Sequence, residues 1–148
     1  MKKWLDEFLN ELHKNYLKEL GFRKVRRTFS RDMGDYWERF NFQGSSWNSS
    51  DERDWRYYIN LGVEFKDLKP QKNWTYFPHT HWADRIESVV KKASSVGEYN
   101  EKTNKAELAE KLKGFILEAT EKISREISGL RRHYLEDRHL EQYPFNDS

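Results

Sequence analysis

Residues 55–65 alternate more strictly than any other part of the chain. Large apolar or aromatic side chains stand at every odd position, with mostly polar or small ones between them. Because successive side chains of a strand point to opposite faces of a sheet, this alternation predicts a half-buried antiparallel strand. Its core face is expected to carry Trp55, Tyr57, Ile59, Leu61, Val63 and Phe65.

Two runs before it predict strands at about 22–31 and 36–43, joined by a tight turn at Met33-Gly34. Glycine tolerates the positive φ that a two-residue hairpin loop requires, so we expect Gly34 within this loop. The pairs across the two strands are then Thr28 with Arg39, Arg26 with Asn41, and Lys24 with Gln43.

Apolar side chains at three- and four-residue spacing predict helices before and after these strands. Gly21 stands where a C-terminal cap of the first helix belongs, and Asn104 with Glu107 matches the capping box that opens a helix. Val96 and Tyr99 are consistent with a short edge strand. The predicted helices cover about 2–20, 81–93, 104–128 and 131–141.

The order of these elements predicts an α+β fold in a single domain, residues 1–148. We expect an antiparallel sheet of three to four strands, with its strand core at about 22–65. The N-terminal helix and the long C-terminal helix are expected to pack on one face of this sheet. Nine Phe, eight Tyr and six Trp residues would supply much of the core, since rings bury more area than aliphatic side chains.

The amino-acid composition mainly excludes classes of function. The formal net charge is +2, so no strong overall field attracts nucleic acid or an anionic membrane. The chain contains no cysteine, which excludes disulfides and thiolate chemistry. Charges interrupt the first apolar residues, and no apolar run is long enough to span a membrane. We therefore expect a cytoplasmic protein that does not contact the membrane.

Under the pairing above, cationic, amide and aromatic side chains share the sheet face that points away from the helices. The polar loop Gln43–Asp51 follows at one end. Charge-assisted hydrogen bonds and stacking on such a face suit an anionic small molecule or a protein partner. A solvated sheet surface, or a loop built from Asx turns, explains the same residues without a ligand. The candidate ligand-binding residues are Arg26, Arg39, Asn41, Gln43, Ser45, Trp47, Asn48, Arg56, Tyr58 and Asn60.

Known catalytic motifs are missing from the sequence. It has no glycine-rich phosphate loop, nucleophile elbow or His-Glu-x-x-His pattern, and we predict no catalytic residue, metal site or cofactor. His79 and His81 form a close pair, but no third zinc ligand lies nearby in the sequence, which favours a polar loop. His133 and Asp137 have the i,i+4 spacing of an ordinary pair on a helix surface.

A basic run at residues 23–27 raises the alternative of weak single-stranded nucleic-acid binding on a basic and aromatic sheet face. Strand alternation divides the charges of this run between two faces, so any such contact would be weak and sensitive to salt. An enzyme of unknown class is a further alternative.

Three short motifs stand out in the first half of the chain: Leu20-Gly21-Phe22, the stretch 41–48 (Asn-Phe-Gln-Gly-Ser-Ser-Trp-Asn), and Ile59-Asn60-Leu61-Gly62-Val63. With them, residues 10–65 resemble the domain-of-unknown-function 4304 family of small bacterial proteins. The family has no established activity, so no catalytic role can be carried over to any residue. The resemblance implies the fold and a bacterial cytosolic origin, and it leaves the function open. Gly44 stands where members commonly carry a basic residue. We expect a non-catalytic binding protein that uses the polar sheet face and the loop Gln43–Asp51.

Overall fold

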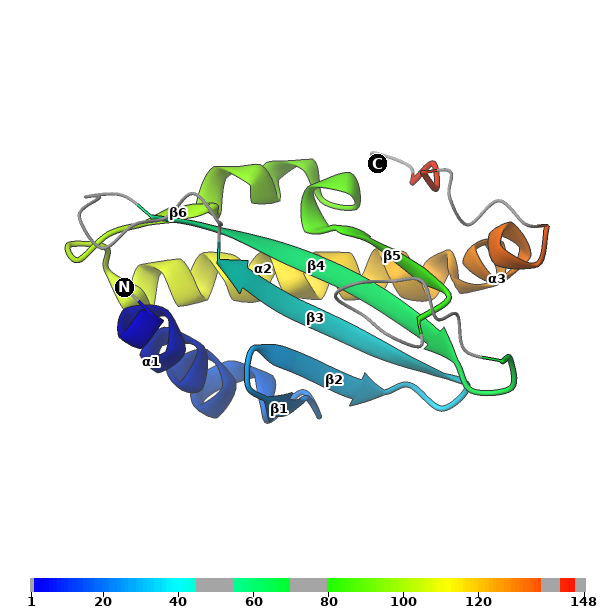
Figure 1. Cartoon of the computed structure of the whole chain (residues 1–148), viewed down its shortest axis with the longest axis horizontal. Coiled ribbons are helices and arrows are strands. Elements are labelled where there is room, and N and C mark those ends of the chain that lie inside the picture. Colours follow the sequence, from blue (N-terminus) through cyan, green and yellow to red (C-terminus); the bar gives the residue numbers. More distant parts are fainter. Residues whose placement is uncertain (1, 45–54, 70–79, 137–141, 146–148) are drawn as a thin grey trace.

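The structure, a computed structural model of the chain, describes residues 2–44, 55–69, 80–136 and 142–145. Its elements form a sheet, and the long helix of residues 105–125 passes behind this sheet in the view of Figure 1. The strands are β1 (Arg23–Val25), β2 (Thr28–Asp32), β3 (Tyr36–Gly44), β4 (Trp55–Phe65), β5 (Trp82–Arg85) and β6 (Glu98–Tyr99). The helices are α1 (Lys2–Leu12), α2 (Lys105–Arg125) and α3 (Ile127–Leu135), with short helical turns η1 (His13–Leu17), η2 (Ile86–Ser88) and η3 (Lys91–Val96).

The described strands pair in the order β1-β2-β3-β4-β5, and every neighbouring pair is antiparallel. The short strand β6 also pairs with β4, beyond the point where β5 ends. The sequence therefore predicts the α+β class and the antiparallel sheet correctly, while the sheet has more strands than the three to four expected. The helices pack on one face, as expected.

The core lies between the sheet and helices α1 and α2. Leu112 of α2 is fully buried, as are Phe40 and Leu61 of the two central strands. Aromatic rings fill much of the space between them, and Phe29 and Phe42 meet edge to face with ring centroids 5.7 Å apart. Edge-to-face contacts of this kind stabilise a core beyond the area they bury.

The predicted strand 22–31 is wrong as a single strand, because it folds back on itself. β1 and β2 form a hairpin in which Val25 pairs with Thr28, leaving Arg26 and Arg27 as a two-residue loop. Arg26 has a φ of 56°, in the left-handed region that such a loop requires. Arginine is an uncommon residue there, so no residue of this segment signals a turn.

The register between β2 and β3 also differs from the prediction by two residues. Thr28 pairs with Asn41, and Ser30 pairs with Arg39. The backbone N–H of Met33 donates to the carbonyl of Tyr36 at 2.9 Å, which makes Gly34 and Asp35 the loop residues in place of Met33 and Gly34. Gly34 has a φ of 92°, so the loop places it at the position where positive φ is needed.

The predicted helix 81–93 is wrong, because strand β5 and two 3₁₀ turns occupy this segment. The side chains that suggested a helix, Trp82, Ile86, Val89 and Ala93, are all buried. The spacing of these residues therefore predicts correctly that they are buried, but it predicts the wrong backbone conformation. A short strand followed by tight turns can bury the same positions when it packs at the edge of a sheet.

The helices at the two ends deviate less from the sequence. α1 continues as a π-helical turn to Leu17, and Gly21 ends this segment with a φ of 94°. Asn104 caps α2 by accepting a hydrogen bond from the Glu107 N–H at 3.1 Å, as the capping box predicts. α3 begins at Ile127, before Gly129, where the sequence predicts a break. No described helix is long and apolar enough to cross a membrane.

Gly129 lies inside α3 because a neighbouring side chain needs the space. A Cβ atom at this position would come within 2.1 Å of the Tyr143 hydroxyl oxygen. That hydroxyl donates a hydrogen bond to the Glu126 carboxylate at 2.6 Å, at the junction of α2 and α3. Gly129 thus permits a close approach of Tyr143 to the helix and does not end the helix.

Candidate functional site

The face of the sheet opposite α1 and α2 carries the candidate site, and Figure 1 looks onto it. No described helix lies over this face. The register aligns one residue from each of four strands in a row that crosses the sheet: Thr28, Asn41, Asn60 and Arg85. We call the polar face the set Thr28, Trp37, Arg39, Asn41, Gln43, Tyr58, Asn60, Glu64 and Arg85.

Amide groups occupy the centre of the polar face and hydrogen-bond to one another. Asn41 Nδ2 donates to Thr28 Oγ1 at 2.9 Å. Asn60 Nδ2 lies 3.4 Å from Asn41 Oδ1 and 3.2 Å from Gln43 Oε1. Asn60 is only 7 % exposed, so its amide is held in one orientation by these partners. The sequence therefore places Asn41, Gln43 and Asn60 correctly on a common face.

Arg39 lies on the polar face as predicted, but its charge is neutralised. Its Nη1 donates to Glu64 Oε1 at 2.7 Å, and its guanidinium lies 5.6 Å from the centre of the Trp37 ring. Lys66 approaches the same ring at 5.1 Å. An ion pair of this length satisfies much of the guanidinium, so Arg39 is a weaker anion site than its position in the sequence suggests.

Arg85 is the cation that the sequence analysis missed. Its guanidinium lies 4.0 Å from the centre of the Tyr58 ring, close enough for a cation–π contact. Its Nη1 is buried and has no hydrogen-bond partner. Arg85 belongs to β5, so predicting a helix at 81–93 hid its place beside Asn60. A strand predicted at Trp82–Arg85 would have placed Arg85 on the polar face.

Two predicted cations do not join the polar face as expected. Arg26 is in the β1–β2 loop, so it does not pair with Asn41. Arg56 is two-thirds exposed at the far end of β4, where it pairs with Glu98 at 3.0 Å. Lys24, also expected on this face, pairs with the buried Phe29 and so lies on the core side, because the hairpin loop reverses the chain.

Three predicted residues, Ser45, Trp47 and Asn48, lie outside the described residues, as does most of the loop Gln43–Asp51. The same holds for His79 and Asp137. The described part of the candidate site is therefore the polar face alone.

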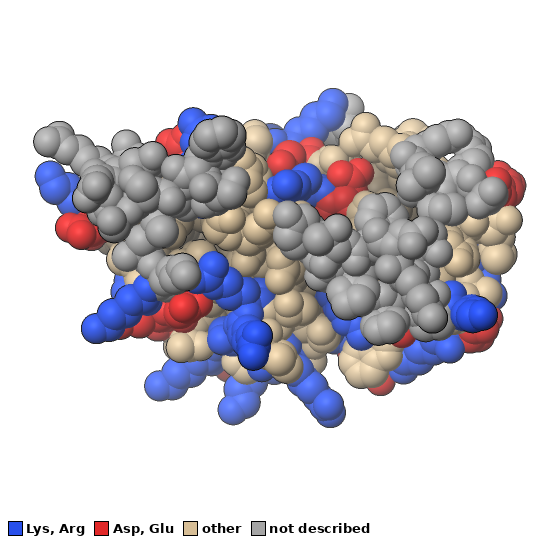
Figure 2. Space-filling model, viewed as in Figure 1, with Lys and Arg blue, Asp and Glu red and all other residues tan. Residues whose placement is uncertain are grey.

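Lys and Arg side chains gather along the lower edge of Figure 2, below the sheet. The β1–β2 hairpin lies at this edge in Figure 1 and contributes Arg23, Lys24 and Arg26. None of these three has an ion pair with a described residue. The positive charge of the basic run 23–27 is therefore concentrated at the hairpin, beside the polar face rather than across it.

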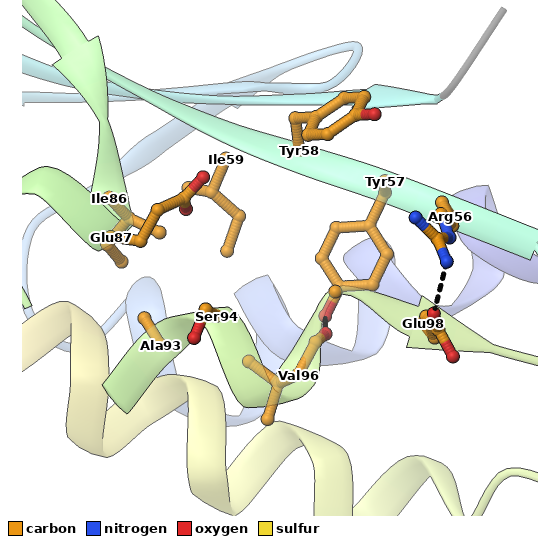
Figure 3. A pocket seen from close by; sticks show the side chains of 11 residues that line it. Arg56, Tyr57, Tyr58, Ile59, Ile86, Glu87, Ala93, Ser94, Val96 and Glu98 are labelled. Carbon is orange, nitrogen blue, oxygen red and sulfur yellow. Dashed lines mark hydrogen bonds and ion pairs between the residues drawn. The ribbon is translucent and has the colours of Figure 1, made fainter. Parts of the chain in front are cut away.

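A pocket of about 160 Å³ lies between β4 and the turns η2 and η3 (Figure 3). Tyr57 and Ile59 form one wall, and Glu87 extends toward the hollow from η2. The Arg56–Glu98 ion pair lies at the other end. This pocket is small and carries an excess negative charge, so it suits an anion less well than the polar face does.

The histidines of the described residues serve the fold. His81 is fully buried, its Nδ1 accepts from the Phe65 N–H at 2.9 Å, and its Nε2 lies 2.8 Å from the Lys69 carbonyl oxygen. These partners identify a neutral ring with the proton on Nε2. His133 is buried against the edge of Tyr143. In the described ranges no three His, Asp or Glu side chains gather as metal ligands would.

The comparison with family models gives one match, to Domain of unknown function (DUF4304), over residues 13–126. This range covers most of the chain and includes every residue of the polar face. The chain belongs to the DUF4304 family. The resemblance stated from the sequence is thus confirmed.

No curated protein and no solved structure matches the chain. The DUF4304 match includes strands β1 to β6 and all of α2, and it ends before α3. The polar face is therefore built from the part of this chain that defines it as a DUF4304 protein. The family description names no ligand or reaction, so function must be argued from the side chains.

Proposed function

We propose that this DUF4304 protein is a non-catalytic binding protein whose polar face receives an anionic group. The group belongs to a small molecule or to an acidic side chain of a protein partner. The single observation that supports this proposal is Arg85, whose buried Nη1 lacks a hydrogen-bond acceptor. A buried donor without an acceptor costs about 1–3 kcal/mol. A carboxylate or phosphate that drew the partly exposed guanidinium outward would recover this cost.

The surroundings of Arg85 favour an anion over a neutral ligand. Tyr58 holds the guanidinium by its ring face, and Asn60 is its cross-strand neighbour. No described acid pairs with Arg85, whereas Arg39 and Arg56 each have a Glu partner. The polar face thus offers one uncommitted cation beside a fixed row of amides, which suits a planar or tetrahedral oxyanion.

The remaining parts of the proposal come from the sequence. The loop Gln43–Asp51 adjoins the end of β3 and would supply further hydrogen-bonding groups to the ligand. A bacterial cytosolic location is what the family resemblance implies. An enzyme of unknown class stays an alternative.

Binding of single-stranded nucleic acid has less support from the described polar face than from the sequence. The two rings of the polar face, Trp37 and Tyr58, already stack with cations of the protein itself. Sequence-independent binding of single strands depends on rings that are free to stack with bases. The described face therefore suits a compact anion better than a row of bases.

The test is a titration of ¹⁵N-labelled protein with inorganic phosphate, succinate and a tetraglutamate peptide, followed by NMR. We expect shifts of the Arg85 Nε–H signal and of the Asn60 side-chain amide with at least one probe. Arg85→Gln should weaken binding about tenfold or more, because a charge-assisted hydrogen bond contributes roughly 1.5–3 kcal/mol. Arg125→Gln, an exposed cation of α2 on the other side of the sheet, is the matched control and should bind as the wild type does.

Glu64→Gln gives a second, opposite readout. It removes the ion pair that neutralises Arg39 and leaves a second uncommitted cation on the same face. We expect tighter binding of the probe that the wild type selects. Absence of any shift, or equal binding by wild type and Arg85→Gln, would contradict the proposal. Binding of a single-stranded oligonucleotide in preference to all three probes would favour the nucleic-acid alternative.

A further inference from the structure

A second polar cluster lies on the opposite face of the sheet, inside the core. Arg31 of β2 and Glu38 of β3 are direct cross-strand partners there. Glu38 is fully buried, and among described residues it is the one buried acid. Thr120 of α2 closes the cluster from the helix side by donating a hydrogen bond to Glu38 Oε1.

Several polar atoms of this cluster lack hydrogen bonds. Glu38 Oε2 is 3.6 Å from Arg31 Nη2, within reach of charge attraction but too far for a hydrogen bond. Arg31 Nη1 donates to the Leu20 carbonyl at 3.3 Å, while Nε and Nη2 make no hydrogen bond. Tyr36 Oη also makes none of normal geometry, although the Ser124 hydroxyl lies nearby.

These unsatisfied atoms belong to three side chains on one face of adjacent strands. Tyr36 is two residues from Glu38 in β3, so both point the same way. Each buried polar atom without a partner costs about 1–3 kcal/mol, and several in one place exceed what a small domain tolerates. A single water molecule can donate to an acceptor and accept from a donor, and so satisfy two or three of them.

We infer that Arg31, Tyr36 and Glu38 form a binding site for an ordered internal water molecule. The water accepts a hydrogen bond from Arg31 Nη2 and donates one to Glu38 Oε2. Its other hydrogen-bonding positions face the Tyr36 hydroxyl. The Arg31–Glu38 separation of 3.6 Å is too long for a direct hydrogen bond, so both atoms can bond to a water that lies beside the pair.

The electrostatics of the cluster agree with a polar molecule at this position. Burial raises the pKa of Glu38, and Thr120 and Arg31 oppose the rise without cancelling it. Burial also raises the pKa of Tyr36, with a contribution from the Glu38 charge, whereas Ser124 and Arg31 lower it. Arg31 is the cation that faces both groups, and the groups from α2 are hydroxyls.

Tyr36 lies between the buried cluster and a pocket at the end of the sheet. Tyr36 also lines a pocket of about 520 Å³ between the β2–β3 loop, the end of β4 and the start of α3. Ser124 and Ser128, one helical turn apart, are exposed on this side, and Ser128 lines the same pocket.

A high-resolution crystal structure tests the site directly. We expect a water within hydrogen-bond distance of Glu38 Oε2 and of Arg31 Nη2 or Tyr36 Oη. A dry cluster in which Arg31 and Glu38 bond directly would overturn the inference.

A solution measurement gives an independent readout. Oxygen-17 relaxation dispersion counts long-lived internal waters, and we expect the double variant Arg31→Met/Glu38→Leu to lose one relative to the wild type. The matched control is Arg39→Met/Glu64→Leu, which removes a similar pair from the polar face and should lose none. An unchanged count in the first variant would refute the inference, and the wild-type crystal structure decides the matter if that variant fails to fold.

Discussion

Glu38 and Arg39 are consecutive residues of β3, yet their two ion pairs differ in nearly every physical property. Glu38 points into the core, where its carboxylate is fully buried and lies 3.6 Å from Arg31. Arg39 points to the polar face, where it meets Glu64 at 2.7 Å and both side chains remain about one-fifth exposed. The same Arg–Glu chemistry thus occurs on the two faces of one strand, once buried and long, once partly exposed and short.

The N–O distance of an ion pair therefore does not by itself decide how much the pair contributes to stability. The shorter pair has water beside it, which screens the attraction and also solvates either partner when the other is removed. The longer pair lies where removal of one partner leaves a charge with little solvent to replace it. We therefore expect the longer pair to matter more for stability and the shorter pair to matter more for ligand access.

The largest effect is expected from Arg31→Met, which leaves the Glu38 carboxylate buried without its cation. Breaking a buried pair in this way costs about 3–5 kcal/mol, measurable by urea unfolding. The double variant Arg31→Met/Glu38→Leu should regain most of this loss, because an apolar pair of similar volume fits the core. If the double variant is as unstable as the single one, packing against Leu20 and Phe22 explains the loss and the comparison fails.

A smaller effect is expected at the hydroxyl that caps the buried carboxylate. Thr120→Val keeps the shape of the side chain but removes the donor to Glu38 Oε1, at a cost of about 1–3 kcal/mol. Thr28→Val on the polar face removes the partner of Asn41 in the same way. We expect a cost below about 1 kcal/mol there, since water replaces the lost bond. Equal losses in the two variants, compared by thermal or urea unfolding, would contradict the expected contrast.

The free energy of unfolding should depend on pH because the pKa of Glu38 differs between the folded and unfolded states. Because burial raises its pKa above the ordinary value of 4.5, the folded protein retains this proton at pH values where the unfolded chain has lost it. The contribution of Glu38 to the free energy of unfolding is therefore full below pH 4.5 and decreases as the pH rises through the folded pKa. One proton gives a slope of at most about 1.4 kcal/mol per pH unit.

Glu38→Gln should remove this slope, measured by urea unfolding across the acid to neutral range. Glu64→Gln is the control on the other face, and it should keep the slope because Glu38 is intact. A wild type whose pH profile matches that of Glu38→Gln would show that the buried carboxyl does not titrate differently in the two states.

The smallest effect is expected from Arg39→Met, which breaks the short pair on the polar face. Exposed or half-exposed pairs contribute about 0.2–1 kcal/mol, and salt reduces this further. Urea unfolding at low and high salt should show a small loss that shrinks with ionic strength. A loss as large as that of Arg31→Met would mean that the polar face is drier than its exposure indicates.

How much of the fold and of the candidate site could be predicted from the sequence differs from one element to the next. β4 agrees with its predicted bounds because strict alternation from Trp55 to Phe65 allows only one assignment. The same alternation placed Arg39, Asn41 and Asn60 on one face. α2 was predicted well because its apolar stripe and its Asn104 cap point to the same helix.

The parts that were missed lack a local signal. The hairpin loop at Arg26 adopts a left-handed conformation without Gly, Asn or Asp, and tertiary pairing of β1 with β2 imposes it. β5 carries a helix-like apolar spacing, so Arg85 was assigned to the wrong element. The Arg31–Glu38 cluster depends on the register of β2 and β3. The predicted pair of Thr28 with Arg39 puts Glu38 opposite Phe29, two residues away from its partner Arg31 in the structure.

The way in which two short strands share β4 has a consequence for self-association. β5 and β6 each pair with part of β4, so a strand of a second molecule cannot pair with β4 without displacing them. Among the described strands the outer edges of β1, β5 and β6 remain for lateral growth of the sheet. β1 is three residues long and carries Arg23 and Lys24, with Arg26 next to it in the hairpin loop. Two copies that met along β1 would repel each other, most strongly at low ionic strength, which disfavours pairing at this edge.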